Sequence, residues 1–272
     1  MNPVDELRLA ALALLVQADP SQKAAGVRGL DLQLGAVDTQ RLFEEPPALP
    51  GRPARPLLVP PAGVQARPVH TLEGRATLLH ALAHIEFNAI NLALDITWRF
   101  AGLPDAFYRD WLRVAQEEAL HFTLLRDHLR TLGHDYGDFP GHDALWEMAA
   151  RTQGDVLARV ALVPRTLETR GLDASPPIKA KLVAAGDHRA GEILDVILRD
   201  EIGHVAIGNR WYRHLCAQRG LDPVATYAEL ARAHGAPRPR GPFNLEARRA
   251  AGFDEAELAA LAEPPDLPTR PD

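Results

Sequence analysis

The segment QEEALHF (residues 116–122) places a histidine, His121, three residues after a glutamate, Glu118. The same Glu-x-x-His pattern returns in DEIGH (residues 200–204). In a helix, residues three apart lie one above the other on one face, with Cβ atoms about 5–6 Å apart. Each segment therefore presents a carboxylate and an imidazole within reach of one metal ion.

Three glutamates, Glu86, Glu118 and Glu201, lie on helix faces that are otherwise apolar. Positions four and seven residues away on either side share a helix face. For the three glutamates in turn these neighbours are Leu79, Leu82, Ile90 and Ala93; Trp111, Val114, Phe122 and Leu125; and Leu194, Ile197, Val205 and Gly208. A buried carboxylate is costly unless it is paired, protonated or bound to a metal. The pattern therefore indicates a polar site inside a helical core.

A lone glutamate precedes each Glu-x-x-His segment, at Glu86 and at Glu168. The interval from Glu86 to Glu118 is one residue shorter than the interval from Glu168 to Glu201. Each half of the chain is therefore predicted to be a helical hairpin with the same order of polar residues. The neighbours of Glu168 are mixed and Pro164 is expected to kink its helix, so a surface glutamate beside an arginine is the alternative there.

One Glu from each of two helices, with Glu-x-x-His from each of the other two, is the ligand pattern of ferritin-like di-iron bundles. The sequence therefore predicts one site at which two metal ions are held by Glu86, Glu118, His121, Glu168, Glu201 and His204. Oxygen and nitrogen ligands of this kind favour Fe/Fe or Mn/Fe over softer metals. The alternative interpretation is a buried salt-bridge network of the same acids with histidines and arginines.

Other polar residues are candidates to support these ligands. Ligating histidines need outer hydrogen-bond partners, and Asp95 and Asp195 lie in apolar surroundings on the helices of two of the glutamates. We expect them to accept from the free ring nitrogens of the ligating histidines, with His84 as a further outer contact. Acids also stand directly before the two Glu-x-x-His pairs, at Glu117 and Asp200. No residue is assigned a catalytic role.

Helical periodicity predicts an all-α, ferritin-like four-helix bundle of two hairpins. Its long helices are expected at 71–101, 105–132, 142–170 and 177–218. Glycine- and proline-containing stretches separate them at 102–104, 133–141 and 171–177. Connections as short as these join antiparallel neighbours.

The chain divides into four expected parts. Residues 1–43 form an N-terminal helical segment with helices at 1–18 and 20–28, and residues 44–70 form a connector too rich in proline for a helix. The bundle occupies 71–218. A C-terminal extension, 219–272, contains short helices at 222–234 and 254–262 and a loose tail.

Composition narrows the range of possible functions and partners. The net charge is −6 and the arginines are interspersed with acids, which argues against nucleic acid as a partner. No apolar run is long enough for a membrane span, and the N-terminus lacks the positive region of a signal peptide, so we expect a cytoplasmic protein. Homo-oligomer formation remains open. Cys216 is the sole cysteine, which excludes a rubredoxin-like four-thiolate iron domain.

Several segments resemble the ferritin-like family labelled as domain of unknown function 455. The matching segments are HALAHIEFNAINLALD (80–95), QEEALHF (116–122), LETRGLDASPP (167–177), DEIGHVAIGNRWY (200–212) and GPFNLEARRAAGF (241–253). The resemblance covers nearly the whole chain. It implies a ferritin-like fold and a di-iron type of site at the six positions above, and little about the substrate. More remotely, the ligand set is similar to those of rubrerythrins, bacterioferritins and a tRNA-modifying hydroxylase.

The leading functional hypothesis is an oxidoreductase that activates O2 or peroxide at a di-iron or Mn/Fe centre, with electrons from a separate donor. Three alternatives stay open. They are an iron-handling protein for ferroxidase activity or storage, a tRNA-base hydroxylase, and a non-catalytic helical bundle whose metal ions only stabilise the fold.

Overall fold

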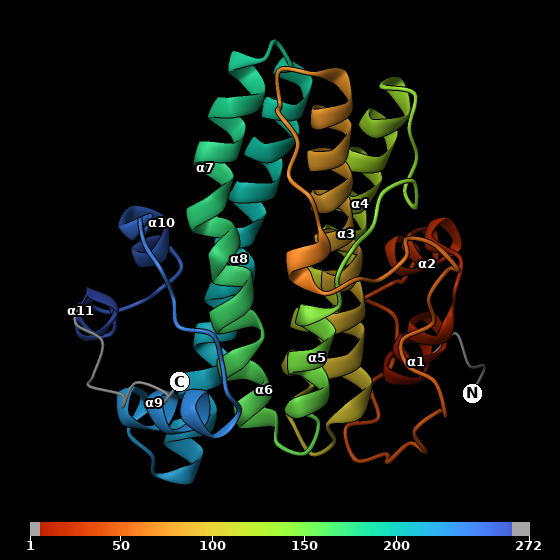
Figure 1. The fold of residues 1–272 in the computed structure, drawn as a ribbon. Coiled ribbons are helices and arrows are strands. Elements are labelled where there is room, and N and C mark those ends of the chain that lie inside the picture. Colours follow the sequence, from red (N-terminus) through yellow and green to blue (C-terminus); the bar gives the residue numbers. More distant parts are fainter. Residues whose placement is uncertain (1–5, 263–272) are drawn as a thin grey trace.

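The computed structural model describes residues 6–262, and these fold into helices and loops (Figure 1). Helices α3 (Leu72–Arg99) and α4 (Asp105–Thr131) form the first long hairpin. The second hairpin joins α6 (Val156–Leu162), a π-helical segment (Pro164–Glu168) and α7 (Thr169–Ala184) to the long helix α8 (His188–Arg219). A short helix, α5 (Ala144–Arg151), precedes the second hairpin.

Local signals account for the ends of the first hairpin. The side chain of Thr71 accepts a hydrogen bond from the Gly74 N–H at 3.0 Å and caps the start of α3. At the turn, Gly102 has φ +79, a backbone conformation that favours glycine. The fully buried Arg8 binds the carbonyl oxygens of Thr97 and Trp98 at the end of α3. The helices predicted at 71–101 and 105–132 are thus confirmed to within two residues at each end.

The boundaries predicted for the second hairpin were wrong. The predicted helix 142–170 is broken after α5 and again at the π-helical segment, and the predicted break at 171–177 lies inside α7. The actual turn comes later, where Gly186 has φ +85. Asp187 then caps α8 by accepting from the Ala190 N–H at 3.0 Å.

Helix α7 contains two prolines, Pro176 and Pro177, and continues through them because a distant residue compensates. Proline lacks the N–H that would bind the carbonyl four residues earlier. The carbonyl oxygen of Leu172, which Pro176 leaves free, accepts instead from the side-chain amide of Asn244 at 3.2 Å. The partner lies far away in the sequence, so local rules for helix termination fail here.

The hydrophobic core runs through both hairpins. Helix α3 packs chiefly against α4, α7 packs against α8, and α4 and α8 join the two hairpins. Buried apolar side chains such as Phe87, Trp111, Phe122 and Leu194 belong to one continuous cluster. Glu118, His121, Glu201 and His204 lie at the α4–α8 contact, in the interior of this core.

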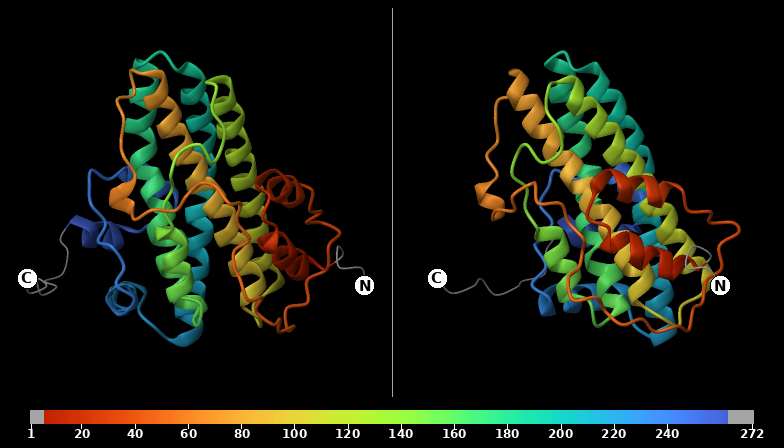
Figure 2. Two further views of the ribbon diagram at one scale, coloured as in Figure 1. Left: turned by 45° about the vertical axis from the view of Figure 1, so that its right-hand side comes forward. Right: turned by 90° about the vertical axis from the view of Figure 1, so that its right-hand side faces the viewer.

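The N-terminal helices α1 (Leu7–Val16) and α2 (Pro20–Arg28) pack on α3 and α4, on one flank of the molecule (Figure 2). The fully buried Lys23 joins them to the bundle by donating to the carbonyl oxygens of Leu15 (3.1 Å) and Gly51 (2.9 Å) and to the side chain of Asn91. Both helices match the predicted ranges, although residues 1–5 of the first range lie outside the described chain.

The proline-rich connector is extended, with one 3-10 turn at Pro61–Gly63. It is tied to the loop after α4, because the Val59 N–H donates to the Gly141 carbonyl at 2.8 Å and the Gly141 N–H donates to the Leu57 carbonyl at 3.0 Å. Figures 1 and 2 show this strap running along the outside of the long helices.

The C-terminal helices α9 (Pro223–Ala233), α10 (Leu245–Ala250) and α11 (Glu255–Ala262) lie on the flank opposite α1 and α2 (Figure 2). Two of them match the predicted ranges. Helix α10 was not predicted; the side chain of Asn244 caps it. The predicted tail, residues 263–272, lies outside the described part of the chain. Among the helices of residues 6–262, none is sufficiently long and apolar to span a bilayer.

His80 gives the fold a testable dependence on pH. It is fully buried, and its Nε2 accepts from the Gly137 N–H at 2.9 Å. Burial, aided by neighbouring His84, lowers the pKa of His80 from 6.5 to about 4. Between these values the unfolded chain binds a proton that the folded protein excludes, so acid reduces the free energy of unfolding, by about 3 kcal/mol in full.

We therefore expect wild type to lose more stability than His80→Gln when urea unfolding is compared at neutral pH and near pH 4.5. Glutamine can still accept from the Gly137 N–H. His70→Gln, at an exposed position, is the control and should behave as wild type does. An equal loss in wild type and His80→Gln would contradict the assignment.

Candidate metal centre

Glu118 lies between two imidazoles at the contact of α4 and α8. Its Oε2 is 3.3 Å from His121 Nδ1 in its own helix, and its Oε1 is 3.0 Å from His204 Nδ1 in α8. All three side chains are fully buried. Their positions follow from the i, i+3 spacing within α4 and from the antiparallel packing of α8 against it.

Two more carboxylates complete a tight group with Glu118 and His121. Glu86 projects from α3 and places its Oε2 3.4 Å from His121 Nδ1. Glu201 projects from α8, with its Oε1 3.6 Å from His204 Nδ1. Ligand atoms of Glu86, Glu118, His121 and Glu201 all lie within 4.8 Å of one another. Metal–ligand bonds of about 2 Å put two ligands of one ion at most about 4 Å apart, so a small contraction suffices.

Glu168 enters from the π-helical segment. Its N–H donates to the carbonyl oxygen five residues earlier, Val163, at 3.4 Å, which is the π-helical pattern. The residue is partly exposed, but its Oε2 is buried and has no hydrogen-bond partner. The charges of Glu201 and Glu118 act on this carboxyl, so the π-helical segment brings Glu168 towards the same group of residues.

The outer ring nitrogens of the two histidines bind acids in a crossed arrangement. His121 in α4 donates from Nε2 to Asp200 in α8 at 3.1 Å. His204 in α8 donates from Nε2 to Glu117 in α4 at 2.7 Å. These contacts leave both Nδ1 atoms facing Glu118. The signal for this pairing was the acid directly before each Glu-x-x-His.

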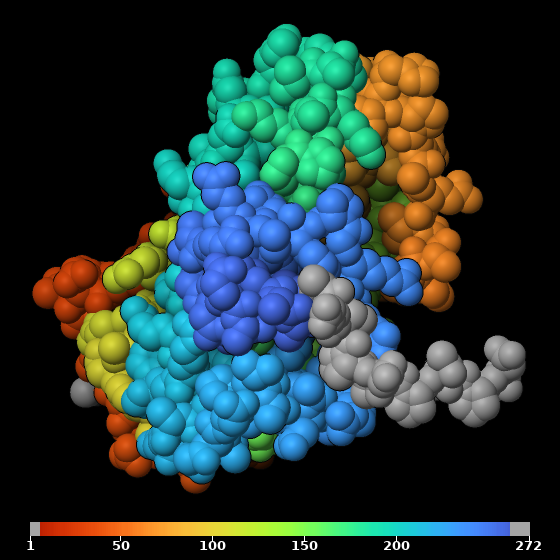
Figure 3. Space-filling model, turned by 90° about the vertical axis from the view of Figure 1, so that its left-hand side faces the viewer, coloured from red at the N-terminus to blue at the C-terminus, as the bar shows by residue number. Residues whose placement is uncertain are grey.

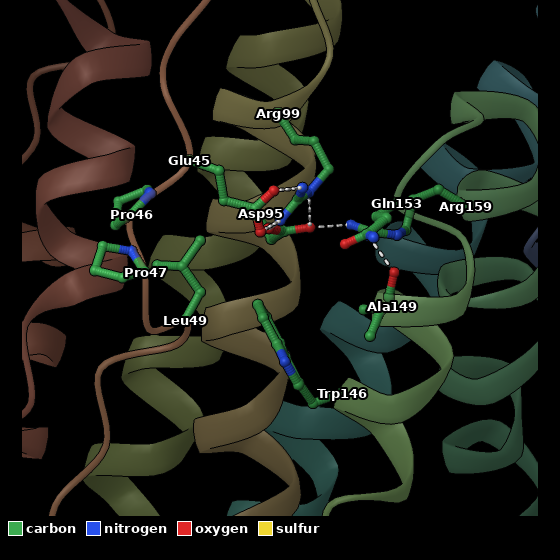
Figure 4. A pocket seen from close by; sticks show the side chains of 11 residues that line it. Glu45, Pro46, Pro47, Leu49, Asp95, Arg99, Trp146, Ala149, Gln153 and Arg159 are labelled. Atoms are coloured by element: carbon green, nitrogen blue, oxygen red, sulfur yellow. Dashed lines mark hydrogen bonds and ion pairs between the residues drawn. The ribbon is translucent and has the colours of Figure 1, made fainter.

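The residues expected in this outer position were Asp95 and Asp195, and that expectation was wrong. Asp95 is fully buried but binds Arg99 and Arg159 beneath the strap (Figure 4). Asp195 is exposed and pairs with Lys179 at 2.5 Å. Both acids are satisfied by arginine or lysine side chains that sequence periodicity does not place.

The outer role expected for His84 was also wrong. Its Nε2–H donates to the His142 carbonyl at 2.9 Å, and Nδ1 lies 2.9 Å from the Tyr136 hydroxyl. Two cavities lie beneath the strap, of about 220 and 230 Å³. Asp95 lines the first (Figure 4) and His84 the second, and neither is lined by the six predicted ligands.

Burial and mutual repulsion disfavour the charged form of three carboxyls of the group. Burial raises the pKa of Glu86, Glu168 and Glu201, and the negative charge of Glu118 or of a neighbouring glutamate adds to each shift. Glu118 behaves oppositely: burial would raise its pKa, but the contacts with His204 and His121 lower it.

The two imidazoles are held in the charged form. Burial acts to lower their pKa, but the surrounding carboxylates raise the pKa of His121 and of His204 well above the usual 6.5. Asp200 and Glu118 contribute most for His121, and Glu118 and Glu117 for His204. A metal ion that binds here has to displace protons, because it needs carboxylates and neutral imidazoles.

Several buried polar atoms of the group lack hydrogen-bond partners. Glu168 Oε2 and Glu201 Oε2 have none, and Glu118 Oε1 and His204 Nδ1 face each other at 3.0 Å without forming a hydrogen bond. Buried polar atoms are paired in the great majority of cases. Ligand atoms without hydrogen bonds, gathered in one place, fit a cation between them, and the cluster could hold a metal ion.

Fold and site together define an all-helical bundle protein with a buried cluster of glutamates and histidines suited to a metal. Residues 16–259 match the family described as Protein of unknown function (DUF455), and the chain belongs to that family. This confirms the resemblance of the sequence motifs to domain of unknown function 455. The chain is also similar to an uncharacterized protein of Haemophilus influenzae, with 48% identity over 262 residues, 92% of this chain and 91% of the relative. No solved structure matches it.

The crossed contacts predict selective effects on the two imidazoles. Asp200→Asn removes a negative charge from His121 Nε2, so the pKa of His121 should fall while that of His204 changes little. Glu117→Gln should do the reverse. Histidine titrations by NMR on metal-free protein measure both, and each variant is the control for the other. Equal effects of either variant on the two rings would contradict the crossed arrangement.

Proposed function

We propose that this chain is a ferritin-like di-metal carboxylate protein and an oxidoreductase. Two Glu-x-x-His pairs on antiparallel helices share one carboxylate, Glu118, whose two oxygens face the two Nδ1 atoms at 3.3 and 3.0 Å. This observation carries the proposal, because a carboxylate between two imidazoles would offer an oxygen ligand beside each ring nitrogen.

The distances suggest which residues would hold each ion. Glu86 and His121 lie on one side of Glu118, at 3.4 Å from each other. His204 lies on the other side, and its charge acts on Glu168 of the π-helical segment, so these two residues would hold the other ion. Glu201 approaches His204 and also belongs to the group around His121, so it would help to hold the ions.

The donor set fits iron or manganese. Four carboxylates balance the charge of two divalent ions, and oxygen ligands with imidazole suit Fe and Mn, as Fe/Fe or Mn/Fe. Two of these ligands, Glu168 and Glu201, have a buried oxygen without a hydrogen-bond partner. Such ions, when bound, would supply electrons to a small oxidant, O2 or peroxide.

The chain itself orients the ligands. Asp200 and Glu117 would fix the tautomer of the two histidines and keep each Nδ1 directed inwards. The pKa of Glu86 and of Glu168 is raised by burial in the metal-free protein, so metal binding at these carboxyls would release protons. The core packed around Glu118 excludes water. Electrons would come from a separate donor, and the substrate is not assigned.

Metal content tests the proposal. Protein purified from cells supplied with iron and manganese should carry about two ions of these metals per chain, measured by elemental analysis. Glu118→Ala/Glu201→Ala should lose them. The control is Glu73→Ala/Glu192→Ala, which removes two exposed glutamates and should keep the metal. Equal metal content in both double variants would contradict the proposal of a di-metal site at these residues.

The oxidoreductase assignment has its own test. Metal-loaded protein given a chemical reductant should consume O2 or hydrogen peroxide over many turnovers, and the Glu118→Ala/Glu201→Ala variant should not. A single stoichiometric burst followed by iron retention would instead favour iron handling. Bound metal without consumption of either oxidant would favour a braced, non-catalytic bundle.

A further inference from the structure

The C-terminal segment, residues 222–262, covers the second hairpin at the level of the π-helical segment. Figure 3 shows it in blue across the face of α7 and α8. An apolar cluster fastens it there, made by Leu172 of α7, Val205 of α8 and, from the segment, Ala247, Ala251, Phe253 and Leu258. A second set of contacts is polar and reaches the π-helical segment itself.

Arg165 is the centre of these polar contacts. It lies within the π-helical segment and is only 6% exposed. Its guanidinium lies 4.8 to 4.9 Å from the ring centres of Tyr212, Tyr227 and Phe253. Arginine over aromatic faces is an attractive arrangement, and two of these three rings come from the C-terminal segment.

Glu257 in α11 provides the charge that this buried guanidinium requires. Its Oε1 accepts from Arg165 at 2.5 Å, and its Oε2 accepts from Arg213 of α8 at 2.6 Å. It is held in place by a capping box, since the Glu257 N–H donates to Asp254 and the Asp254 N–H donates to Glu257. Removing one partner of a buried ion pair leaves an uncompensated charge, which is strongly unfavourable.

Further contacts hold the π-helical segment from both sides. The hydroxyl of Thr166 donates to the Ala161 carbonyl at 2.7 Å and lies 3.0 Å from the hydroxyl of Tyr227 in α9. On the α8 side, a Cβ at Gly208 would lie 3.2 Å from the Cβ of Pro164. The absence of a side chain at Gly208 therefore lets the π-helical segment pack closely on α8.

These contacts have a consequence for Glu168, three residues after Arg165. A helix closes by default with bonds to the fourth residue back, and π-helical turns are rare and depend on their surroundings. The wider turn places the Glu168 Oε2 in the buried group near Glu201. Arg165 meanwhile faces the C-terminal helices. One short segment thus joins the candidate metal centre to the C-terminal segment.

We propose that Arg165 and Glu257 are positioning residues: their ion pair clamps the π-helical segment and so holds Glu168 at the metal centre. This clamp is formed by residues of this chain and does not require bound metal. Its effect on metal binding rests on the proposed di-metal function. The C-terminal segment then completes the half of the site that contains Glu168 and His204, while the half with Glu86 and His121 does not depend on it.

Manganese titrations of metal-free protein test the clamp, with free Mn²⁺ followed by EPR. Arg165→Gln should weaken the binding of the ion held by Glu168 and His204 by about 10–100-fold, the usual effect of losing an outer partner. The affinity for the ion held by Glu86 and His121 should not change. Glu168→Gln should do the same, and the double variant should be no worse than Glu168→Gln alone. A merely destabilising change would not reproduce this non-additivity.

The matched control is Arg248→Gln. Arg248 is an arginine of the same C-terminal segment, only 3% exposed and bound to Asp173 of α7 at 2.6 Å. Its side-chain hydrogen bonds go to Asp173 and not to the π-helical segment, so both ions should bind as in wild type. Wild-type binding of both ions to Arg165→Gln, or equal weakening in the two arginine variants, would overturn the proposal.

Amide hydrogen exchange tests the clamp independently of metal binding. In metal-free protein, Arg165→Gln should speed exchange at Leu167 and Glu168, and Arg248→Gln should not. If wild type binds no manganese, the di-metal function fails, and exchange alone then decides the clamp. Unchanged exchange in Arg165→Gln would refute the clamp whatever the metal results are.

Discussion

The fully buried carboxylate of Glu118, between His121 and His204, is the interaction on which the rest of the structure depends. A charge in an apolar core is tolerated only with close partners of opposite sign. Each imidazole that supplies such a partner is itself held by an outer acid from the other helix, Asp200 or Glu117. The α4–α8 contact is therefore a polar layer whose register is set by three charged pairs between the helices, Glu118–His204, His121–Asp200 and His204–Glu117, and a one-turn slip of either helix would separate all three.

The two hairpins support this layer differently. The first is regular, with two continuous helices, and Thr71 caps the start of α3. The second departs from regular geometry at the π-helical segment and contains two prolines in α7, and it relies on the C-terminal segment for compensation. Asn244 binds the carbonyl that Pro176 leaves free, and Glu257 neutralises Arg165. The C-terminal segment therefore completes the second hairpin.

Periodicity and spacing were sufficient to predict the helical class, the first hairpin and the buried group of glutamates and histidines. They failed where partners are distant in the sequence. The stretch 171–177 has the composition of a helix end, yet it is helical, and Asn244, far along the chain, binds the carbonyl oxygen that Pro176 leaves free. Asp95 stands in apolar surroundings as a ligand partner would, but Arg159 from another helix neutralises it. The pairing of Asp200 with His121 depends on which face of α8 meets α4, a tertiary fact that the repeated acid before each motif only hints at.

The most direct test of the account is anomalous diffraction from crystals of protein purified without chelators, recorded at the iron and manganese absorption edges. The account predicts two peaks, about 3.5–4 Å apart, on either side of Glu118 and bounded by Glu86, Glu168, Glu201 and the two histidines. A map without peaks, in which these side chains bind one another directly, would contradict it and identify the cluster as a buried network of hydrogen bonds and ion pairs.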